Sequence, residues 1–338
     1  MLNLISISFS LKDETRELAL PFIEDWYDTD KKHVIQATSG STGTPKLIRI
    51  KKNQMRASAR MTGEFFNLSA CENALLCISP EYIGGKMMIV RALEFKLKLY
   101  TAPISANPIE VLDLPIDFAA MVPLQVQTIL EQNPEKLNLI RYLIIGGAPV
   151  SRQLEKQLLE YSCEAYSTFG MTETISHIAL KRLNNTNAPF IGIGESSFST
   201  RDGQLTVNSP ELGISNLVTN DVVEIIHPHA FLWKGRSDHV INTGGVKVFP
   251  EQIEQKLSSH FQHGDYFITS VPDERFGQCV VAIILKDKIS KEELMSSCGV
   301  LLEKFEQPKK VYVAGHFVYL ANNKLDRTGT LRELGFMA

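Results

Sequence analysis

The chain has 338 residues, of which 44% are hydrophobic and 22% are charged, and its formal net charge is −3. This is the composition of a globular protein, with enough chain for two domains or for one large domain and an appendage. A slightly acidic chain leaves no basic footprint, so nucleic acid is excluded as an expected partner. An anionic ligand would have to be held by local loops, helix starts and single Lys or Arg residues.

Cysteines and apolar runs indicate the compartment. The five cysteines are odd in number and no two have CxxC spacing, which is typical of reduced thiols rather than of disulfides or a zinc site. The first residues lack the basic start and continuous apolar core of a signal peptide, and no apolar stretch is long enough to span a bilayer. We therefore expect a soluble cytoplasmic protein without a membrane partner.

The first half of the chain alternates between apolar strand patterns and helical patterns. Strands are predicted at 33–38, 46–50, 73–79, 116–123, 137–147 and 163–170, and helices at 51–68, 84–97, 124–132 and 151–162. Apolar strands that alternate with helices indicate an α/β fold with a mostly parallel sheet covered on both faces.

The pattern changes twice further along the chain. From about Pro189 the strands are short and alternating, at 203–209, 221–228 and 229–235, which indicates a small β-rich subdomain. From Asp238 a compact α+β unit is predicted, with helices at 250–261 and 291–305 and strands at 265–273, 278–286 and 310–318. The sequence thus predicts a large domain over 1–237 and a small C-terminal domain over 238–338.

A hydroxyl-rich loop, TSGSTGTPK, separates the first two predicted strands. Glycines let the backbone turn its N–H groups inward, the Ser and Thr hydroxyls add donors, and a lysine adds a cation, so the loop suits a polyphosphate. Its spacing is not that of the G-x-x-x-x-G-K-[ST] loop, and a plain surface turn is the alternative. The candidate phosphate-binding residues are Thr38, Ser39, Gly40, Ser41, Thr42, Gly43 and Lys46.

This string resembles the phosphate loop of the acyl-adenylate-forming superfamily, which includes acyl-CoA synthetases, peptide-synthetase adenylation domains and luciferases. Further stretches resemble the family's motifs in the same order. In LIIGGAPVS (143–151), the resemblance implies that Gly147, Ala148 and Pro149 lie against adenine. An ordinary strand-to-helix turn is the alternative for this stretch.

The stretch YSTFGMTET (166–174) resembles the family's aromatic-Gly-x-Thr-Glu motif, with Phe in place of the usual Tyr. The resemblance implies that Phe169 stacks near adenine beside Gly170 and that Thr172 bonds a phosphate. It also implies that Glu173 binds Mg²⁺, which agrees with the preference of this hard cation for oxygen ligands. A helix N-cap box is the alternative reading of the Thr-Glu pair.

The later motifs resemble the family's ribose site, hinge and C-terminal segment. By resemblance Asp221 accepts bonds from the ribose hydroxyls, Arg236 lies beside the ribose, and the hinge is at Asp238. The segment LANNKLDRTGTLREL (320–334) resembles the one that carries the adenylation lysine, here Lys324. Two positions depart from the family's pattern, because Asn220 and Asn323 replace glycines. A solvent-facing turn is the alternative interpretation of the Gly-Arg-x-Asp string around Arg236.

The resemblance implies two half-reactions. A carboxylate attacks the α-phosphate of ATP, with Mg²⁺ and Lys324 offsetting charge, and coenzyme A then displaces AMP after the small lid domain swings about the hinge. Gly244 and Gly245 match the loop that lines the pantetheine route, where a side chain would block a narrow channel. Only some three dozen residues precede the phosphate loop, so the chain resembles a shortened member, and a homodimer is one way to cover the surface left open.

The acid is indicated less directly. The stretch SPEYIGGKMMIVRAL occupies the acyl-pocket position, with Tyr82, Gly84 and Lys86 as candidate lining residues. An inward Lys86 or Arg91 would suit a second carboxylate, whereas both could be solvated ends of an amphipathic helix, which we favour for Arg91.

The run GMTETISHIAL resembles 2-succinylbenzoate–CoA ligases of menaquinone biosynthesis more than long-chain or coumarate ligases. Ser176 and His177 would then contact the substrate or simply pack. The expected activity is an ATP-dependent acid–CoA ligase acting on a small carboxylic acid. Two alternatives are an adenylation enzyme that loads an aryl or amino acid onto a carrier protein, and a non-catalytic nucleotide or acyl sensor.

Overall fold

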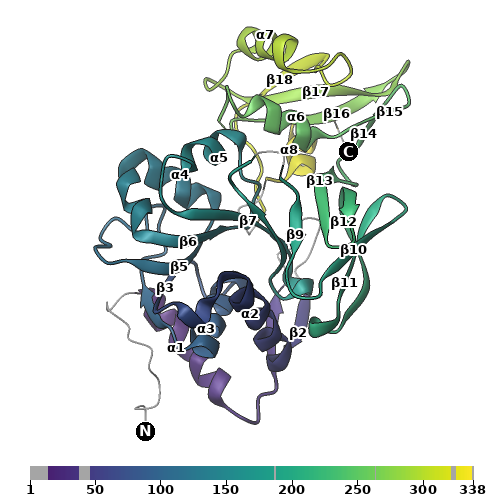
Figure 1. Ribbon diagram of the computed structural model, residues 1–338. Helices are drawn as coiled ribbons and strands as arrows, with labels where there is room; N and C mark the ends of the chain where they lie inside the picture. The colour runs from purple at the N-terminus through teal and green to yellow at the C-terminus, as the bar shows by residue number, and fades with distance from the viewer. Residues whose placement is uncertain (1–13, 38–45, 186–187, 263, 321–324, 337–338) are drawn as a thin grey trace.

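The computed structural model describes residues 14–37, 46–185, 188–262, 264–320 and 325–336 (Figure 1). The helices of this described part are α1 Glu14–Tyr27, α2 Lys52–Phe66, α3 Ile83–Phe95, α4 Pro123–Gln132, α5 Arg152–Leu158, α6 Pro250–Leu257, α7 Lys291–Leu301 and α8 Arg327–Glu333. None of these helices combines the length and the apolarity that crossing a membrane would need.

A small hairpin precedes the main sheet. Strands β1 (His33–Ala37) and β2 (Leu47–Lys51) pair antiparallel, with Ala37 opposite Leu47. The two strands predicted on either side of the hydroxyl-rich loop therefore exist and lie side by side. Residues 38–45 between them lie outside the described residues.

The large sheet has eleven strands in the order β10-β11-β12-β13-β9-β8-β7-β6-β5-β3-β4. The pairs between β4, β3, β5, β6 and β7 are all parallel, as the alternation of strands and helices predicts. The strands of this half are β3 Asn73–Leu76, β4 Lys98–Thr101, β5 Ile116–Met121, β6 Ile140–Ile145 and β7 Glu164–Gly170.

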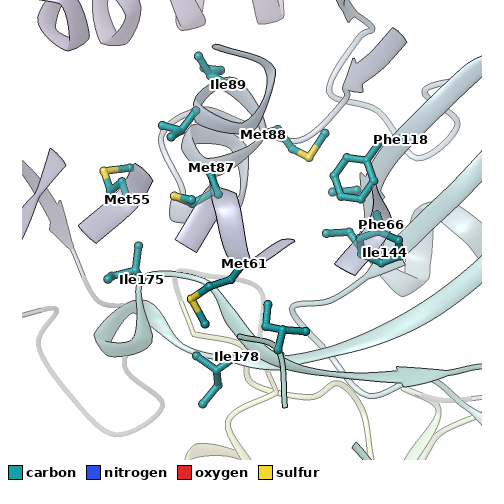
Figure 2. Packing of buried hydrophobic residues seen from close by; sticks show 14 of the residues in the cluster. Met55, Met61, Phe66, Met87, Met88, Ile89, Phe118, Ile144, Ile175 and Ile178 are labelled. Carbon is teal, nitrogen blue, oxygen red and sulfur yellow. The ribbon is translucent and has the colours of Figure 1, made fainter. Parts of the chain in front are cut away.

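Alternating side chains divide this half of the sheet between two helical layers. Phe118, Ile144 and Tyr166 join a buried cluster with α1, α2 and α3, which includes the methionines shown in Figure 2. Their strand neighbours, such as Leu143 and Ala165, join a second cluster with α4 and α5 on the other face. The period of two along each strand thus places helices on both faces, which confirms the predicted α/β architecture.

The β-rich segment continues the same sheet. Strand β8 pairs antiparallel with β7, and the antiparallel pairing runs on through the remaining strands. They are β8 His177–Arg182, β9 Phe190–Gly192, β10 Ser197–Arg201, β11 Gln204–Ser209, β12 Ile214–His227 and β13 Ala230–Arg236. The predicted β-rich subdomain is therefore hydrogen-bonded to the parallel half, and the sheet changes direction at β7.

A second sheet begins after β13. Its strands are β14 Ile241–Thr243, β15 Val246–Val248, β16 Tyr266–Asp273, β17 Gly277–Leu285 and β18 Lys310–Ala314, of which only β18 pairs parallel to its neighbour. Two buried clusters lie on its faces, and every member comes from residue 241 or later. Figure 1 shows this unit above α5 and β13. The domain boundary at 237/238 stays a prediction, and it coincides with the passage from one sheet to the other.

Candidate active site

Three of the predicted motifs meet at one edge of the large sheet. Strands β3, β6 and β7 run in the same direction, so the segments that leave their carboxyl ends emerge together. These segments are 79–86 at the start of α3, 146–151 before α5, and 171–176 after β7. Ligands of open α/β sheets bind outside the carboxyl ends of the strands, near the point where the strand order changes.

Two predicted parts of the site lie outside the described residues. They are the adenylation lysine Lys324 and the phosphate-loop residues Thr38, Ser39, Gly40, Ser41, Thr42 and Gly43. Lys46, the last predicted residue of that loop, is described, is exposed and directly precedes β2. Their assignment to phosphate binding and catalysis stays a prediction.

The turn after β6 exposes the residues predicted to lie against adenine. Gly147 has φ +86°, a left-handed conformation that favours glycine, and it is exposed together with Ala148 and Pro149. The side chain of Ser151 then caps α5 by accepting a bond from the Leu154 amide at 3.1 Å. The turn presents backbone rather than bulky side chains at this edge.

The segment after β7 folds back through a strained turn. Ile175, although β-branched and buried, has φ +69° and ψ −47°, and the amide of Ser176 donates to the Thr174 carbonyl at 2.7 Å. This is a γ-turn of the rare positive-φ kind. The Thr174 hydroxyl, fully buried, holds it: its oxygen accepts from the Met171 amide at 2.9 Å and lies 2.8 Å from the Ser176 carbonyl. Strained backbone of this kind persists only where the surrounding structure holds it in place, and it is found most often at functional sites.

Thr172 and Glu173 directly precede this turn. The Thr172 side chain is buried, whereas the Glu173 carboxylate is exposed at the sheet edge. No group of three or more His, Cys, Asp or Glu in the described part of the chain could hold a metal. A single exposed carboxylate fits Mg²⁺, because this ion usually keeps several waters and binds through one or two carboxylates plus substrate phosphates.

Phe169 belongs to an aromatic group rather than standing apart. Its ring lies edge-on to Phe231 at 5.0 Å between centroids and 5.8 Å from Phe190, so it ties β7 to the antiparallel half of the sheet. The side chain is half-buried. Its stacking on adenine stays a prediction.

The predicted ribose residues are neighbours. Asp221 on β12 is paired in register with Arg236 at the end of β13, and one Asp221 oxygen accepts the indole N–H of Trp233 at 2.9 Å. Arg236 donates two hydrogen bonds to Asp238, of 2.9 and 2.8 Å. These hydrogen bonds are the main reason why the pKa of Arg236 is raised. The predicted hinge residue is therefore tied to the predicted ribose arginine.

Gly244 and Gly245 form a two-residue hairpin between β14 and β15. Both have positive φ, +59° and +84°, which is the requirement of a type I′ turn. Turn geometry therefore explains the glycine pair without a ligand. A Cβ on Gly245 would meet no atom of the described residues within 4 Å, and the contact of this turn with pantetheine stays a prediction.

The start of α3 shows which glycine is sterically required. A Cβ on Gly85 would lie 2.8 Å from the backbone nitrogen of Pro80, whereas on Gly84 it would meet only the Ile78 side chain at 3.1 Å. Gly84 was predicted to line the acyl pocket, whereas Gly85 was not among the predicted pocket residues. Tyr82, also picked, is exposed.

Lys86 points back toward the first strand of the chain. Its ammonium donates to the Gln36 side chain at 2.6 Å and to the Glu81 carbonyl at 3.1 Å, and burial lowers its pKa. Gln36 was not among the predicted site residues. Both partners of Lys86 are neutral groups.

Arg91 is the main correction to the sequence analysis. The favoured reading, a solvated helix end, is wrong: Arg91 is 1% exposed and is the largest fully buried side chain of the described residues. Its guanidinium donates to the Ser176 hydroxyl at 3.0 Å and lies 3.5 Å from Nδ1 of His177. No carboxylate of the described residues forms an ion pair with it, its Nε has no partner among them, and burial lowers its pKa to about 9.

Comparison with known proteins shows the family of the chain. The family model described as AMP-binding enzyme matches residues 7–200, and the chain belongs to this family of acyl-adenylate-forming enzymes. Among solved structures, an acyl-CoA synthetase (AMP-forming)/AMP-acid ligase II-like protein from Dyadobacter fermentans is 34% identical, with 98% of both chains covered and a TM-score of 0.64.

More distant relatives have a named substrate. The 2-succinylbenzoate–CoA ligase of Bacillus cereus is 24% identical over 354 residues, which cover 92% of this chain and 72% of that protein. The O-succinylbenzoate coenzyme A synthetase of Bacillus subtilis, solved with ATP and a magnesium ion, is 20% identical. It matches 88% of this chain and 69% of its own length with a TM-score of 0.77, which shows a shared fold.

Proposed function

We propose that this protein is an AMP-forming acid–CoA ligase that converts 2-succinylbenzoate to its coenzyme A thioester, a step of menaquinone biosynthesis. Support comes from the family membership and from relatives named for this reaction. The motifs also follow one another in the family's order, and three of them lie at the carboxyl ends of the parallel strands. The observation that carries the choice of acid is Arg91.

A buried cation without a counter-ion is costly, because desolvation of the charge is not offset by a partner. Arg91 is held by the neutral hydroxyl of Ser176, three residues after the Glu173 that would bind the metal beside the phosphates. An acid with one carboxylate at the α-phosphate and a second one reaching inward would supply the missing charge. 2-Succinylbenzoate has two carboxylates, and Arg binds such groups in a bidentate manner.

The chemistry requires two anions to approach each other. The family's adenylation lysine, Lys324 here, would lie between the carboxylate and the α-phosphate, and the hydroxyls of the early loop would hold the departing pyrophosphate. Magnesium bound through Glu173 would offset the phosphate charge. Asp221, with one oxygen fixed by Trp233, would present the other to the ribose hydroxyls. The open hairpin at Gly245 would admit the thiol in the second step.

The test follows the two half-reactions separately. We expect pyrophosphate exchange with 2-succinylbenzoate, and thioester formation after coenzyme A is added. Lys324→Ala should lower the exchange rate by about two to three orders of magnitude while thioester formation from added acyl-adenylate persists. An adenylation rate near that of the wild type in this variant would contradict the role of Lys324.

Other outcomes would point to the alternatives. Exchange without a coenzyme A thioester would support loading of a carrier protein. The absence of exchange with every acid of a panel, together with nucleotide binding, would support a sensor. Exchange with monocarboxylic acids only would contradict the proposed substrate and leave the enzyme class intact.

A further inference from the structure

His177 is a buried titratable residue to which the reaction proposed above gives no role. It is 5% exposed at the first position of β8, between α2 and α3. Its Nε2 lies 3.1 Å from the Thr62 hydroxyl oxygen, and its Nδ1 lies 3.5 Å from both Nη2 of Arg91 and the Ser176 hydroxyl oxygen. The two ring nitrogens therefore face different partners, Thr62 on one side and the Arg91–Ser176 pair on the other.

The partners define which nitrogen holds the proton. The Thr62 hydroxyl has one proton, and it donates to the Ser58 carbonyl of the preceding helical turn at 3.1 Å. Thr62 can then only accept from His177, which places the proton on Nε2. Arg91 has donors and no acceptor, so a proton on Nδ1 would oppose an Arg91 N–H.

Electrostatics favours the same neutral form. Burial, and next the charge of Arg91, lower the pKa of His177 well below its usual 6.5. A neutral ring with its lone pair on Nδ1 orients the guanidinium without neutralising it. A carboxylate in place of this ring would pair with Arg91 and remove the charge that a ligand could use.

We propose that His177, fixed in its Nε2–H tautomer by Thr62, is a positioning residue that orients Arg91 toward the second anionic group of the acid. This role rests on the proposed function, because it assigns specificity for a dicarboxylate to a pair of residues that need not touch it. Thr62 and His177 come from α2 and β8, 115 positions apart in sequence, and Arg91 comes from α3.

The first test compares acids. We would measure KM and kcat of adenylation for 2-succinylbenzoate and for 4-oxo-4-phenylbutanoate and 2-butanoylbenzoate, each of which lacks one carboxylate. Thr62→Val and His177→Leu should raise KM for the dicarboxylate about threefold to tenfold, the worth of one hydrogen bond. Neither substitution should change kcat/KM by more than about twofold for whichever of the two monocarboxylates the enzyme adenylates.

Conservative variants serve as matched controls. Thr62→Ser keeps the hydroxyl, and His177→Asn keeps an acceptor near the position of Nδ1, so both should retain the preference for the dicarboxylate. A general packing defect would lower activity on all acids in every variant. Equal effects on the dicarboxylate and the monocarboxylate, or no effect of Thr62→Val, would overturn the proposal.

The second test does not depend on activity. In the full-length protein with ¹⁵N-labelled histidine, the His177 ring, assigned by its loss in His177→Asn, should show a protonated Nε2 and an unprotonated Nδ1 at neutral pH. A proton on Nδ1 would overturn the proposal even in an active enzyme. If the wild type adenylates no acid, the proposed function fails, and the specificity role of His177 fails with it while the tautomer is still reported.

Discussion

Gly170 leaves the space that the carbonyl group of Ser176 occupies. A Cβ on residue 170 would lie 2.7 Å from the Ser176 carbonyl carbon and 2.5 Å from Cα of His177, all backbone atoms that cannot rotate away. The glycine of the Phe-Gly-x-Thr-Glu motif is therefore required by the way the chain folds back on itself. The predicted nucleotide contact of Gly170 is an additional role that stays a prediction.

Gly170→Ala should shift the γ-turn. We expect a loss of about 1–3 kcal/mol in the free energy of unfolding, as for other forced overpacking, and a raised KM for 2-succinylbenzoate because Ser176 and His177 move with the turn. Urea unfolding and adenylation kinetics measure the two effects. The control is Gly299→Ala in α7, where a Cβ meets nothing within 4 Å and about 0.5–1 kcal/mol of stabilisation is expected. Equal behaviour of the two variants would contradict the steric argument.

Arg91→Met should separate stability from function. Removing an unpaired buried charge should leave the melting temperature unchanged or higher, because an apolar side chain of similar length fills the site. Binding of 2-succinylbenzoate should lose about 2–5 kcal/mol, which is thirtyfold or more in KM. Arg60→Met on α2 removes an exposed cation and should change neither quantity by much. A strongly destabilised Arg91→Met would indicate a structural role for the guanidinium instead.

The pH dependence of stability should report His177. Its pKa in the folded protein is lowered below the usual 6.5, first by burial and then by Arg91. Below 6.5 the unfolded chain therefore binds a proton that the folded chain does not, and stability is lost as the pH falls, by up to about 1.4 kcal/mol per pH unit. Urea unfolding between pH 5 and 8 should show a shallower slope for His177→Asn than for the wild type. Identical slopes would contradict a neutral buried ring.

The ion pair between Glu254 and Arg327 should stabilise the end of the chain. Arg327, at the start of α8, binds both oxygens of Glu254 at 2.7 and 2.8 Å, and Glu254 also accepts the Ile268 amide at 2.7 Å. Their side chains are 16% and 8% exposed. Glu254→Gln should cost about 3–5 kcal/mol in thermal or urea unfolding, because it leaves a buried charge unpaired. Glu164→Gln, which breaks an exposed pair with Arg182, should cost less than about 1 kcal/mol.

Local patterns predicted the regular part of the fold. The apolar runs of β5, β6 and β7 and the helices between them follow from periodicity, which is strong when a segment is long and buried. Strands β9, β14 and β15 have three residues each, too few for a period to appear, and residues 177–182 were assigned no element. Helix α5 ends at Leu158, earlier than the predicted Ser162.

The site was predictable where a motif is continuous and unpredictable where distant segments meet. The Thr-Glu motif and the glycine-rich turns were visible as strings. Arg91 was assigned to the solvated face because a charged residue on a helix is usually exposed. Arg91 is buried because Ser176, His177 and the Phe118 ring reach it from other elements, and no local pattern of α3 contains that information.

The separate hydrophobic clusters of the two sheets have a consequence for heating. The chain passes from the large sheet to the small one once, between Arg236 and Ile241, and no buried cluster of the described residues has members from both sides. Each sheet should then melt as its own cooperative unit. We expect differential scanning calorimetry to resolve two transitions. ATP should raise the melting temperature of the transition that belongs to the large sheet.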